Sequence, residues 1–172
     1  MAEVKTVNVV ATADLGQRVD LEELGKFKGI LYDRDVYGGR VAYVKFGVMK
    51  GKVSVFFSGK MISVGTRSEE EAFRDLGCVK DFLVEKVFVR DVKLEPKVRN
   101  VVFMADLRRP IDLERLSVQQ KLIYEPEQFP GAILRLHDPV KATILLFASG
   151  KAVISGLKAR NQISTILNDI LE

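Results

Sequence analysis

The feature that most constrains this 172-residue chain is an internal repeat. When the sequence is slid by 92 residues, Asn8–Val10 falls on the identical Asn100–Val102, and ten of the eighteen positions 7 to 24 are identical. Chance would give about one identity in such a window. Further along, Ser58–Lys60 falls on Ser149–Lys151, an offset of 91. The chain therefore contains two copies of one unit, with one extra residue in the first copy that we place near residues 47–51.

Both copies predict the same order of elements. Asp20 and Asp112 are suited to cap short helices, and Ser68 with Glu71 forms a capping box that opens a longer helix. Residues rich in β-formers predict strands over 6–13, 40–46, 52–57 and 60–64, and over 99–105, 132–136, 141–147 and 151–155. The order is strand, helix, four strands, helix, twice over. We expect residues 1–92 to form the first repeat and 93–172 the second, in an α+β fold with a pseudo-twofold axis.

Composition excludes several classes of protein. The hydrophobic fraction of 47% supports a packed core, and no apolar run is long enough to span a membrane. The N-terminus lacks a secretory signature, so we expect an intracellular protein. One cysteine, Cys78, rules out an internal disulfide, and one histidine, His137, argues against a zinc site. With no Ser/His/Asp set and no Gly-rich phosphate loop, we expect no enzyme activity, metal or cofactor.

One face of the predicted sheet has an unusual composition. Asn8, Val10 and Thr12 alternate onto one side of the first strand. Their counterparts in the second copy are Asn100, Val102 and Met104. Two long helices cannot cover both faces of ten strands, so this apolar face with its single asparagine must meet another molecule. The alternative is that the two asparagines are ordinary turn or strand-end residues.

Several segments resemble a known family. Residues 124–131 read Tyr-Glu-Pro-Glu-Gln-Phe-Pro-Gly, residues 145–151 read Leu-Leu-Phe-Ala-Ser-Gly-Lys, and Gly-Leu-Lys follows at 156–158. These segments resemble the second repeat of TATA-box-binding proteins, especially archaeal ones, and Asn8–Ala11 resembles the family's opening strand. The resemblance covers nearly the whole chain and is weakest over residues 25–66. It implies a saddle-shaped, curved antiparallel sheet of ten strands with helices on the convex face, which grips the minor groove of DNA.

The resemblance also implies roles for the open sheet face. Asn8 and Asn100 would lie at the centre and donate their amide hydrogens to the N3 and O2 acceptors of A·T pairs. An apolar floor cannot satisfy the amino group that guanine adds, so G·C pairs are disfavoured. The resemblance assigns the floor to Val10, Ile62, Val102, Leu145 and Val153. It gives Val64 and Ser155 a groove-facing position that is usually threonine.

Aromatic wedges and phosphate contacts complete the site that the resemblance implies. Phe129 with Phe147, and Tyr37 with Phe56, would insert between base pairs and bend the duplex; Phe57 is an alternative to Phe56. A single phenylalanine of this kind is otherwise an ordinary core residue, and a single surface lysine is merely solvated. Phosphate contacts are expected from Lys60, Arg67, Arg135, Lys151 and Lys158.

The implied partners follow the same resemblance. Glu125 and Glu127 match family positions that bind transcription factor B, and Asp33 and Asp35 hold the equivalent places in the first copy. A solubilising acidic loop is the alternative. The resemblance implies a general initiation factor that recruits transcription factor B and RNA polymerase to double-stranded promoter DNA. It would act at the nucleoid in the cytoplasm of an archaeal-type cell, away from membranes.

Departures from the family pattern gather in the first copy. Tyr37 replaces the usual phenylalanine, Ser54 replaces a floor residue, and Tyr43 stands where arginine is common, although Lys45 lies nearby to substitute for it. Gly38 and Gly39 loosen the same region. Two alternatives therefore remain open: a divergent paralogue that regulates transcription by binding proteins, with weak or no TATA binding, or a binding module of a nucleic-acid enzyme.

Overall fold

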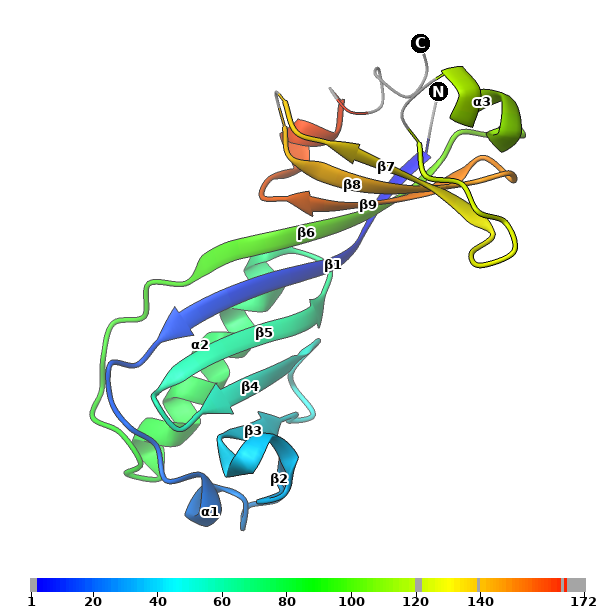
Figure 1. Cartoon of the computed structure of the whole chain (residues 1–172). Coiled ribbons are helices and arrows are strands. Elements are labelled where there is room, and N and C mark those ends of the chain that lie inside the picture. The colour runs from blue at the N-terminus through cyan, green and yellow to red at the C-terminus, as the bar shows by residue number, and fades with distance from the viewer. Residues whose placement is uncertain (1–2, 120–121, 139, 165, 167–172) are drawn as a thin grey trace. The chain divides into compact units, whose positions relative to one another are not determined.

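The computed structural model in Figure 1 describes residues 3–119, 122–138, 140–164 and 166 of the chain. It is an α+β fold that divides into two compact units, one of Asn8–Arg99 and the other of Met1–Val7 with Asn100–Glu172. The dividing points lie inside the two longest strands, β1 (Glu3–Asp14) and β6 (Lys97–Asp106). No described helix is both long and apolar enough to cross a bilayer.

The unit Asn8–Arg99 contains an antiparallel sheet with the strand order β2-β3-β4-β5-β1. Its strands after β1 are β2 (Ile30–Tyr32), β3 (Val41–Val44), β4 (Lys52–Phe56) and β5 (Lys60–Thr66). The helix α1 (Leu21–Leu24) follows β1, the short 3-10 helix η1 (Val36–Gly39) joins β2 to β3, and α2 (Glu69–Glu85) follows β5. This is the predicted order of strand, helix, four strands and helix.

The second unit repeats this order with one strand fewer. Its sheet runs β6-β9-β8-β7, from β7 (Gly131–Leu136), β8 (Ala142–Phe147) and β9 (Lys151–Leu157). The helix α3 (Leu113–Gln119) follows β6, and η2 (Arg160–Gln162) follows β9. A single bridge between Ile123 and Ile133 stands where β2 stands in the first copy, so the described residues hold nine strands, not the expected ten. In the predicted closing helix Ile163 and Ile166 are buried, while Leu167, Ile170 and Leu171 lie outside the described residues.

Local hydrogen bonds confirm the predicted helix starts. The carboxylates of Asp20 and Asp112 accept from the backbone N–H three residues later, at 3.1 and 3.0 Å. Ser68 Oγ accepts from Glu71 N–H at 3.1 Å, but the Glu71 carboxylate accepts from Arg67 N–H instead of closing the box onto Ser68. The two copies therefore begin their short helices with the same capping interaction.

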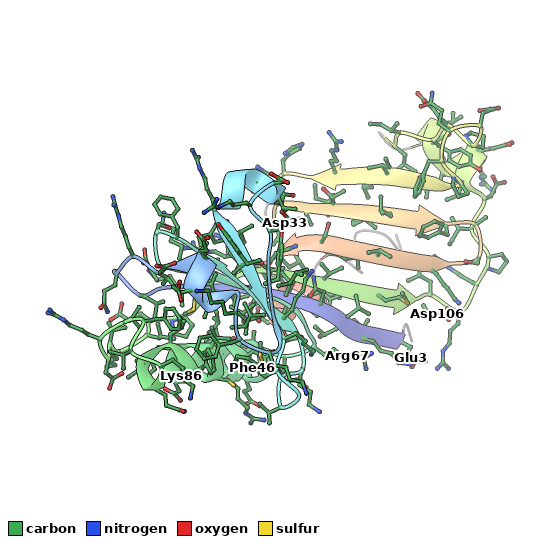
Figure 2. All side chains as sticks on the ribbon, turned by 90° about the horizontal axis from the view of Figure 1, so that it is seen from below. Glu3, Asp33, Phe46, Arg67, Lys86 and Asp106 are labelled. Carbon is green, nitrogen blue, oxygen red and sulfur yellow. The ribbon has the colours of Figure 1, made fainter. Side chains whose placement is uncertain are left out.

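The core of the unit Asn8–Arg99 lies between α2 and one face of its sheet (Figure 1). Val53, Val55 and Met61 are fully buried and alternate along β4 and β5 with half-buried neighbours. From α2, Leu76 and Val79 are equally buried. Phe46 lies beside α2 in Figure 2, where its ring centroid is 4.9 Å from that of Phe82. Since α2 covers this face of the sheet, the half-buried residues that alternate with the core residues along each strand lie on the opposite face.

Candidate nucleic-acid interface

The side chains that alternate with the core form what we call the open face of each unit. In Asn8–Arg99 this face carries Asn8, Val10, Thr12, Tyr43, Ser54, Phe56, Ile62 and Val64, all half-buried. In the second unit it carries Asn100, Val102, Met104, Ile133, Leu145, Phe147, Val153 and Ser155, of which only Met104 is exposed, at 44%. Cross-strand register supports the grouping, because Thr12 pairs with Ile62 and Met104 with Val153. Each residue assigned to the groove floor therefore lies on the open face of its unit.

The two open-face asparagines make the same hydrogen bond in both copies. Asn8 Oδ1 accepts from Gly65 N–H at 2.8 Å, and Asn100 Oδ1 accepts from Gly156 N–H at 2.8 Å. A backbone N–H can only donate, so each amide must turn its oxygen toward the sheet and leave its NH2 group for another acceptor. Both residues lie inside long strands, which excludes the reading of them as turn or strand-end residues.

The second stirrup, by which we mean residues 124–131, holds an assembled ring pair. The rings of Phe129 and Phe147 meet edge-on, with centroids 5.9 Å apart and planes at 60°. Gly131 pairs with Phe147 across β7 and β8. A Cβ at Gly131 would lie 2.8 Å from Phe129 Cε1 and 3.1 Å from Phe147 Cε1. The ring pair therefore needs a residue without a side chain at this position.

The first stirrup, residues 33–40, is built differently. Tyr37 has a left-handed backbone (φ 50°, ψ 31°) and is 75% exposed. Val41 pairs with Phe56 at the place where Gly131 pairs with Phe147 in the second copy. Among the described aromatic rings, Tyr37 forms no pair with Phe56. The predicted first wedge pair is thus not assembled.

Strand register locates the length difference between the copies. Leu31 pairs with Tyr43, twelve positions later, whereas Ile123 pairs with Ile133, ten positions later. Across the next hairpin Tyr43 pairs with Ser54, eleven positions later, whereas Ile133 pairs with Leu145, twelve positions later. The first copy therefore has two extra residues in its stirrup and one fewer in the following hairpin. The expectation of a single extra residue near 47–51 is wrong, because two length changes of opposite sign produce the net offset.

This register gives Lys45 the place of Arg135, but its ammonium has another task. Lys45 Nζ donates to the carbonyl oxygens of Met49, Lys50 and Gly51 at 2.8, 2.9 and 2.6 Å. From the other side the buried carboxylate of Asp75 accepts from Lys50 N–H at 3.2 Å and from Gly51 N–H at 2.7 Å. Lys45 therefore holds the hairpin and does not substitute for the arginine. Asp75 was not identified from the sequence. It could have been noticed as an acidic residue on the apolar face of the helix that Leu76 and Val79 share.

The remaining charged candidates are exposed. Lys60, Arg67, Arg135, Lys151 and Lys158 all lie at the surface, as phosphate contacts require. Glu125 and Glu127 are exposed in the second stirrup, where the Glu125 carbonyl accepts from Gln128 N–H at 2.9 Å and Phe129 N–H at 3.0 Å. Glu125 and Phe129 therefore belong to one tight turn. Asp33 and Asp35 are exposed in the first stirrup.

Comparison with known proteins agrees with this arrangement. The family model described as transcription factor TFIID, or TATA-binding protein, matches residues 3–80 and again 95–172. A TATA-box-binding protein of Cenarchaeum symbiosum is 41% identical over 168 residues, covering 97% of this chain and 91% of that protein. TATA-box-binding protein 2 of Haloferax volcanii is 36% identical over 169 residues, covering 96% and 89%. The solved structure of Methanococcus jannaschii TBP superposes with a TM-score of 0.84 at 33% identity, covering 98% of this chain and 96% of that one.

Proposed function

The chain belongs to the TATA-binding protein family of transcription factors, and on that premise we propose that it binds A·T-rich promoter DNA through the minor groove to initiate transcription. The observation that carries the proposal is the matched pair of open-face asparagines. Each keeps its amide oxygen on a glycine N–H, which leaves its NH2 group as a donor for another acceptor. Such a donor suits the N3 and O2 atoms, which are the only polar groups that an A·T pair shows in this groove.

Discrimination against G·C pairs follows from the same geometry. The guanine amino group is a donor, so opposite an asparagine NH2 group it meets another donor. On the surrounding floor it meets Val10, Val102, Leu145 and other side chains that cannot accept a hydrogen bond. A buried polar group without a partner costs about 1–3 kcal/mol. The open face therefore favours A·T pairs without reading their order.

Bending is proposed to come from the aromatic side chains. Inserting a ring between base pairs costs a few kcal/mol of unstacking, which the larger contact with bent DNA offsets. This kinking is an established property of the family. In this chain Phe129 and Phe147 supply an assembled pair for it, whereas Phe56 in the first copy faces Val41 across the hairpin. We therefore assign the stronger kink to the second stirrup.

A duplex-binding titration tests the proposal. We expect an A·T-rich duplex to be bound more tightly than a G·C-rich one of equal length. If the five exposed cations Lys60, Arg67, Arg135, Lys151 and Lys158 each neutralise a phosphate, the slope of log K against log salt concentration is about −4.5. Equal affinity for the two duplexes, or no binding at low salt, would contradict the proposal.

We also propose a protein partner for the acidic end of the second stirrup. Glu125 and Glu127 are exposed, and a carboxylate beside DNA repels phosphate, so a basic protein surface is the better partner. By family resemblance this partner is transcription factor B, which then brings RNA polymerase. Glu125→Arg should weaken capture of transcription factor B on DNA and leave the affinity of the protein alone for DNA unchanged or higher. Loss of DNA binding in the absence of any partner would refute the assignment.

The first stirrup favours a second candidate function, that of a regulator which binds proteins and holds DNA weakly. Tyr37 is 75% exposed and not paired with Phe56, so one of the two wedges is missing from the structure. A mobility-shift assay with and without transcription factor B separates the two functions. The initiation factor binds the duplex alone, whereas the regulator binds only the protein partner.

A further inference from the structure

A groove of about 590 Å³ lies at the end of β1 within the unit Asn8–Arg99. Its floor includes the open-face residues Thr12 and Ile62 together with Phe56, and its wall is formed by the segment that leads into β6. The charged residues that line it are the basic Lys60, Lys93, Lys97 and Arg99 and the acidic Asp14 and Glu95. The groove is therefore a basic extension of the open face. Phe56, Lys60 and Ile62 already have proposed roles in it, whereas Lys97 and Arg99 have none.

Arg99 is fixed in this groove by one hydrogen bond. Its Nε donates to Thr12 Oγ1 at 2.9 Å. No hydrogen bond from its two terminal nitrogens is found among the described residues. A guanidinium held through Nε presents its terminal NH2 groups as a fork for acceptors, and it stays charged at any physiological pH. Arg99 thus adds charged donors beside Thr12, on a face whose other polar side chains, Asn8, Tyr43 and Ser54, are uncharged.

The internal repeat shows that this pair occurs in one of the two units only. At the offset of 92, Arg99 corresponds to Val7 and Thr12 corresponds to Met104. Val7 and Met104 belong to the same unit and are 37% and 44% exposed. Both members of the polar pair are therefore replaced by apolar residues in the other unit.

The charged residues near this pair also differ between the two units. Lys97 corresponds to Lys5, whose ammonium lies 2.8 Å from the Glu3 carboxylate. Hydrogen bonds from Lys5 and Arg108 hold the pKa of Glu3 below its usual value, so Glu3 stays ionised and compensates these cations. In the unit Asn8–Arg99 neither Lys93 nor Lys97 forms an ion pair among the described residues, although Asp14 and Glu95 line the same groove. This unit therefore presents cations without ion-pair partners at this place, and the other presents an apolar surface whose lysine is paired.

We propose that Arg99, positioned by Thr12, determines which way round this protein lies on its DNA. The inference rests on the proposed function. A protein with two similar halves can bind an A·T-rich element in two directions with nearly equal affinity, because A·T and T·A pairs look alike in the minor groove. Arg99 contacts A·T acceptors in the half-element under its own unit, where a guanine amino donor would face a guanidinium donor. The Val7 and Met104 side chains lack this charge, so guanine is tolerated better there.

Direction can be measured by fluorescence energy transfer. Glu85→Cys in a Cys78→Ser background places a single donor dye on the exposed end of α2. The acceptor dye is attached to one end of a duplex whose two halves differ, one all A·T and the other carrying two G·C pairs. Single-molecule populations then give the ratio of the two directions. We expect about a tenfold excess with the unit Asn8–Arg99 over the A·T half, a modest part of what a good bidentate contact discriminates.

The following variants distinguish a role of Arg99 in setting the direction of binding from a general contribution of positive charge to DNA affinity. Arg99→Ala should bring the ratio close to one. Lys97→Ala, the matched removal of a neighbouring cation, should lower affinity in both directions and leave the ratio unchanged. Exchanging the pair, by Arg99→Val and Thr12→Met together with Val7→Arg and Met104→Thr, should invert the ratio.

Two results would overturn the inference, and they can be told apart. An unchanged ratio in Arg99→Ala, with equal losses of affinity in both directions, would make Arg99 a phosphate contact and reject the directional role alone. Absence of any duplex binding at low salt would reject the DNA-binding function and the inference with it. Since Arg99 is exposed, thermal melting should show each single variant folded as the parent is.

Discussion

The two copies share the asparagines that we propose read DNA and differ in the aromatic side chains that we propose deform it. Asn8 and Asn100 make the same 2.8 Å hydrogen bond to a glycine N–H, each within a bulged strand pairing. The stirrups differ in length, backbone conformation and aromatic contacts, as Tyr37 and Phe129 illustrate. The proposed base-reading geometry is therefore the same in both copies, while the proposed wedges differ. Base recognition and DNA bending therefore need to be tested in each copy separately.

The largest expected effect concerns the way in which each copy holds its hairpin to its helix. Asp75 is 2% exposed and bonds two backbone N–H groups of the first hairpin, whereas the residue 91 positions later is the buried Ile166. Asp75→Ile should lower the free energy of unfolding by about 3 kcal/mol, because the buried N–H of Gly51 and the part-buried N–H of Lys50 lose their acceptor. Chemical denaturation measures this, with Glu70→Ala on the exposed face of α2 as the control. A cost below that of the control would show that both copies tolerate an apolar contact here.

The next prediction tests the shared geometry. Asn8→Asp and Asn100→Asp each keep an oxygen for the glycine N–H but remove the NH2 donors. Each should reduce affinity for A·T duplex by about 2–3 kcal/mol, the upper range for a base contact, with little change in thermal stability. Fluorescence anisotropy with a labelled duplex gives the affinity. Clearly unequal losses would mean that the two asparagines do not perform the same task.

A smaller effect separates the stirrups. Phe129→Ala should lower DNA affinity by about 2 kcal/mol and reduce bending, because an assembled wedge is removed. Tyr37→Ala should cost less than about 0.5 kcal/mol, because the rearrangement that brings the exposed Tyr37 to Phe56 offsets most of what its contact with DNA would contribute. Energy transfer between dyes at the two duplex ends reports the bend. If Tyr37→Ala is as damaging as Phe129→Ala, Tyr37 is a specific contact and the stirrups are equivalent in function.

The smallest effect lies in the turn after the first strand of each copy. Asp14 Oδ1 accepts from Gly16 N–H and Asp106 Oδ1 accepts from Arg108 N–H, both at 2.8 Å. The φ angles are 64° at Gly16 and 55° at Arg108, a left-handed region that an arginine occupies at a cost of about 1 kcal/mol. Arg108→Gly should therefore raise stability by less than about 1 kcal/mol, since glycine also loses more chain entropy. A stability loss above this size would show that the exposed pair of Arg108 with Glu3 outweighs the backbone strain.

The sequence predicted most of the scaffold because the repeat supplied a second copy of each signal. Asp20 and Asp112 cap equivalent helices, and Gly59 and Gly150 turn equivalent hairpins with φ of 91° and 83°. The alternation of strand residues also placed Val10 and Val102 on the same face as Asn8 and Asn100, whereas the other floor residues were assigned by the family resemblance. Each of these signals depends on neighbours in the chain, so a local pattern is sufficient to reveal it.

The first stirrup and its hairpin could not be predicted in the same way. Their two length changes of opposite sign lie in a segment with few identities, so a sequence offset registers only their sum. The role of Lys45 depends on three carbonyl groups that a hairpin brings around one ammonium, and Asp75 reaches the same hairpin from 24 positions away. Such contacts depend on backbone geometry and strand register, which residue types alone do not encode.

For the bending that we propose, the glycine next to the second ring pair implies that the two kinks form one after the other. With Gly131 in place, Phe129 and Phe147 already touch, so this half can wedge open a base step on first encounter. The first stirrup must rearrange before Tyr37 can reach Phe56, because Val41 occupies the matching position. We therefore expect the duplex to kink in two resolved phases, a fast one at the second stirrup and a slower one at the first. The lifetime of the half-bent intermediate would then set how long a partner has to capture the complex.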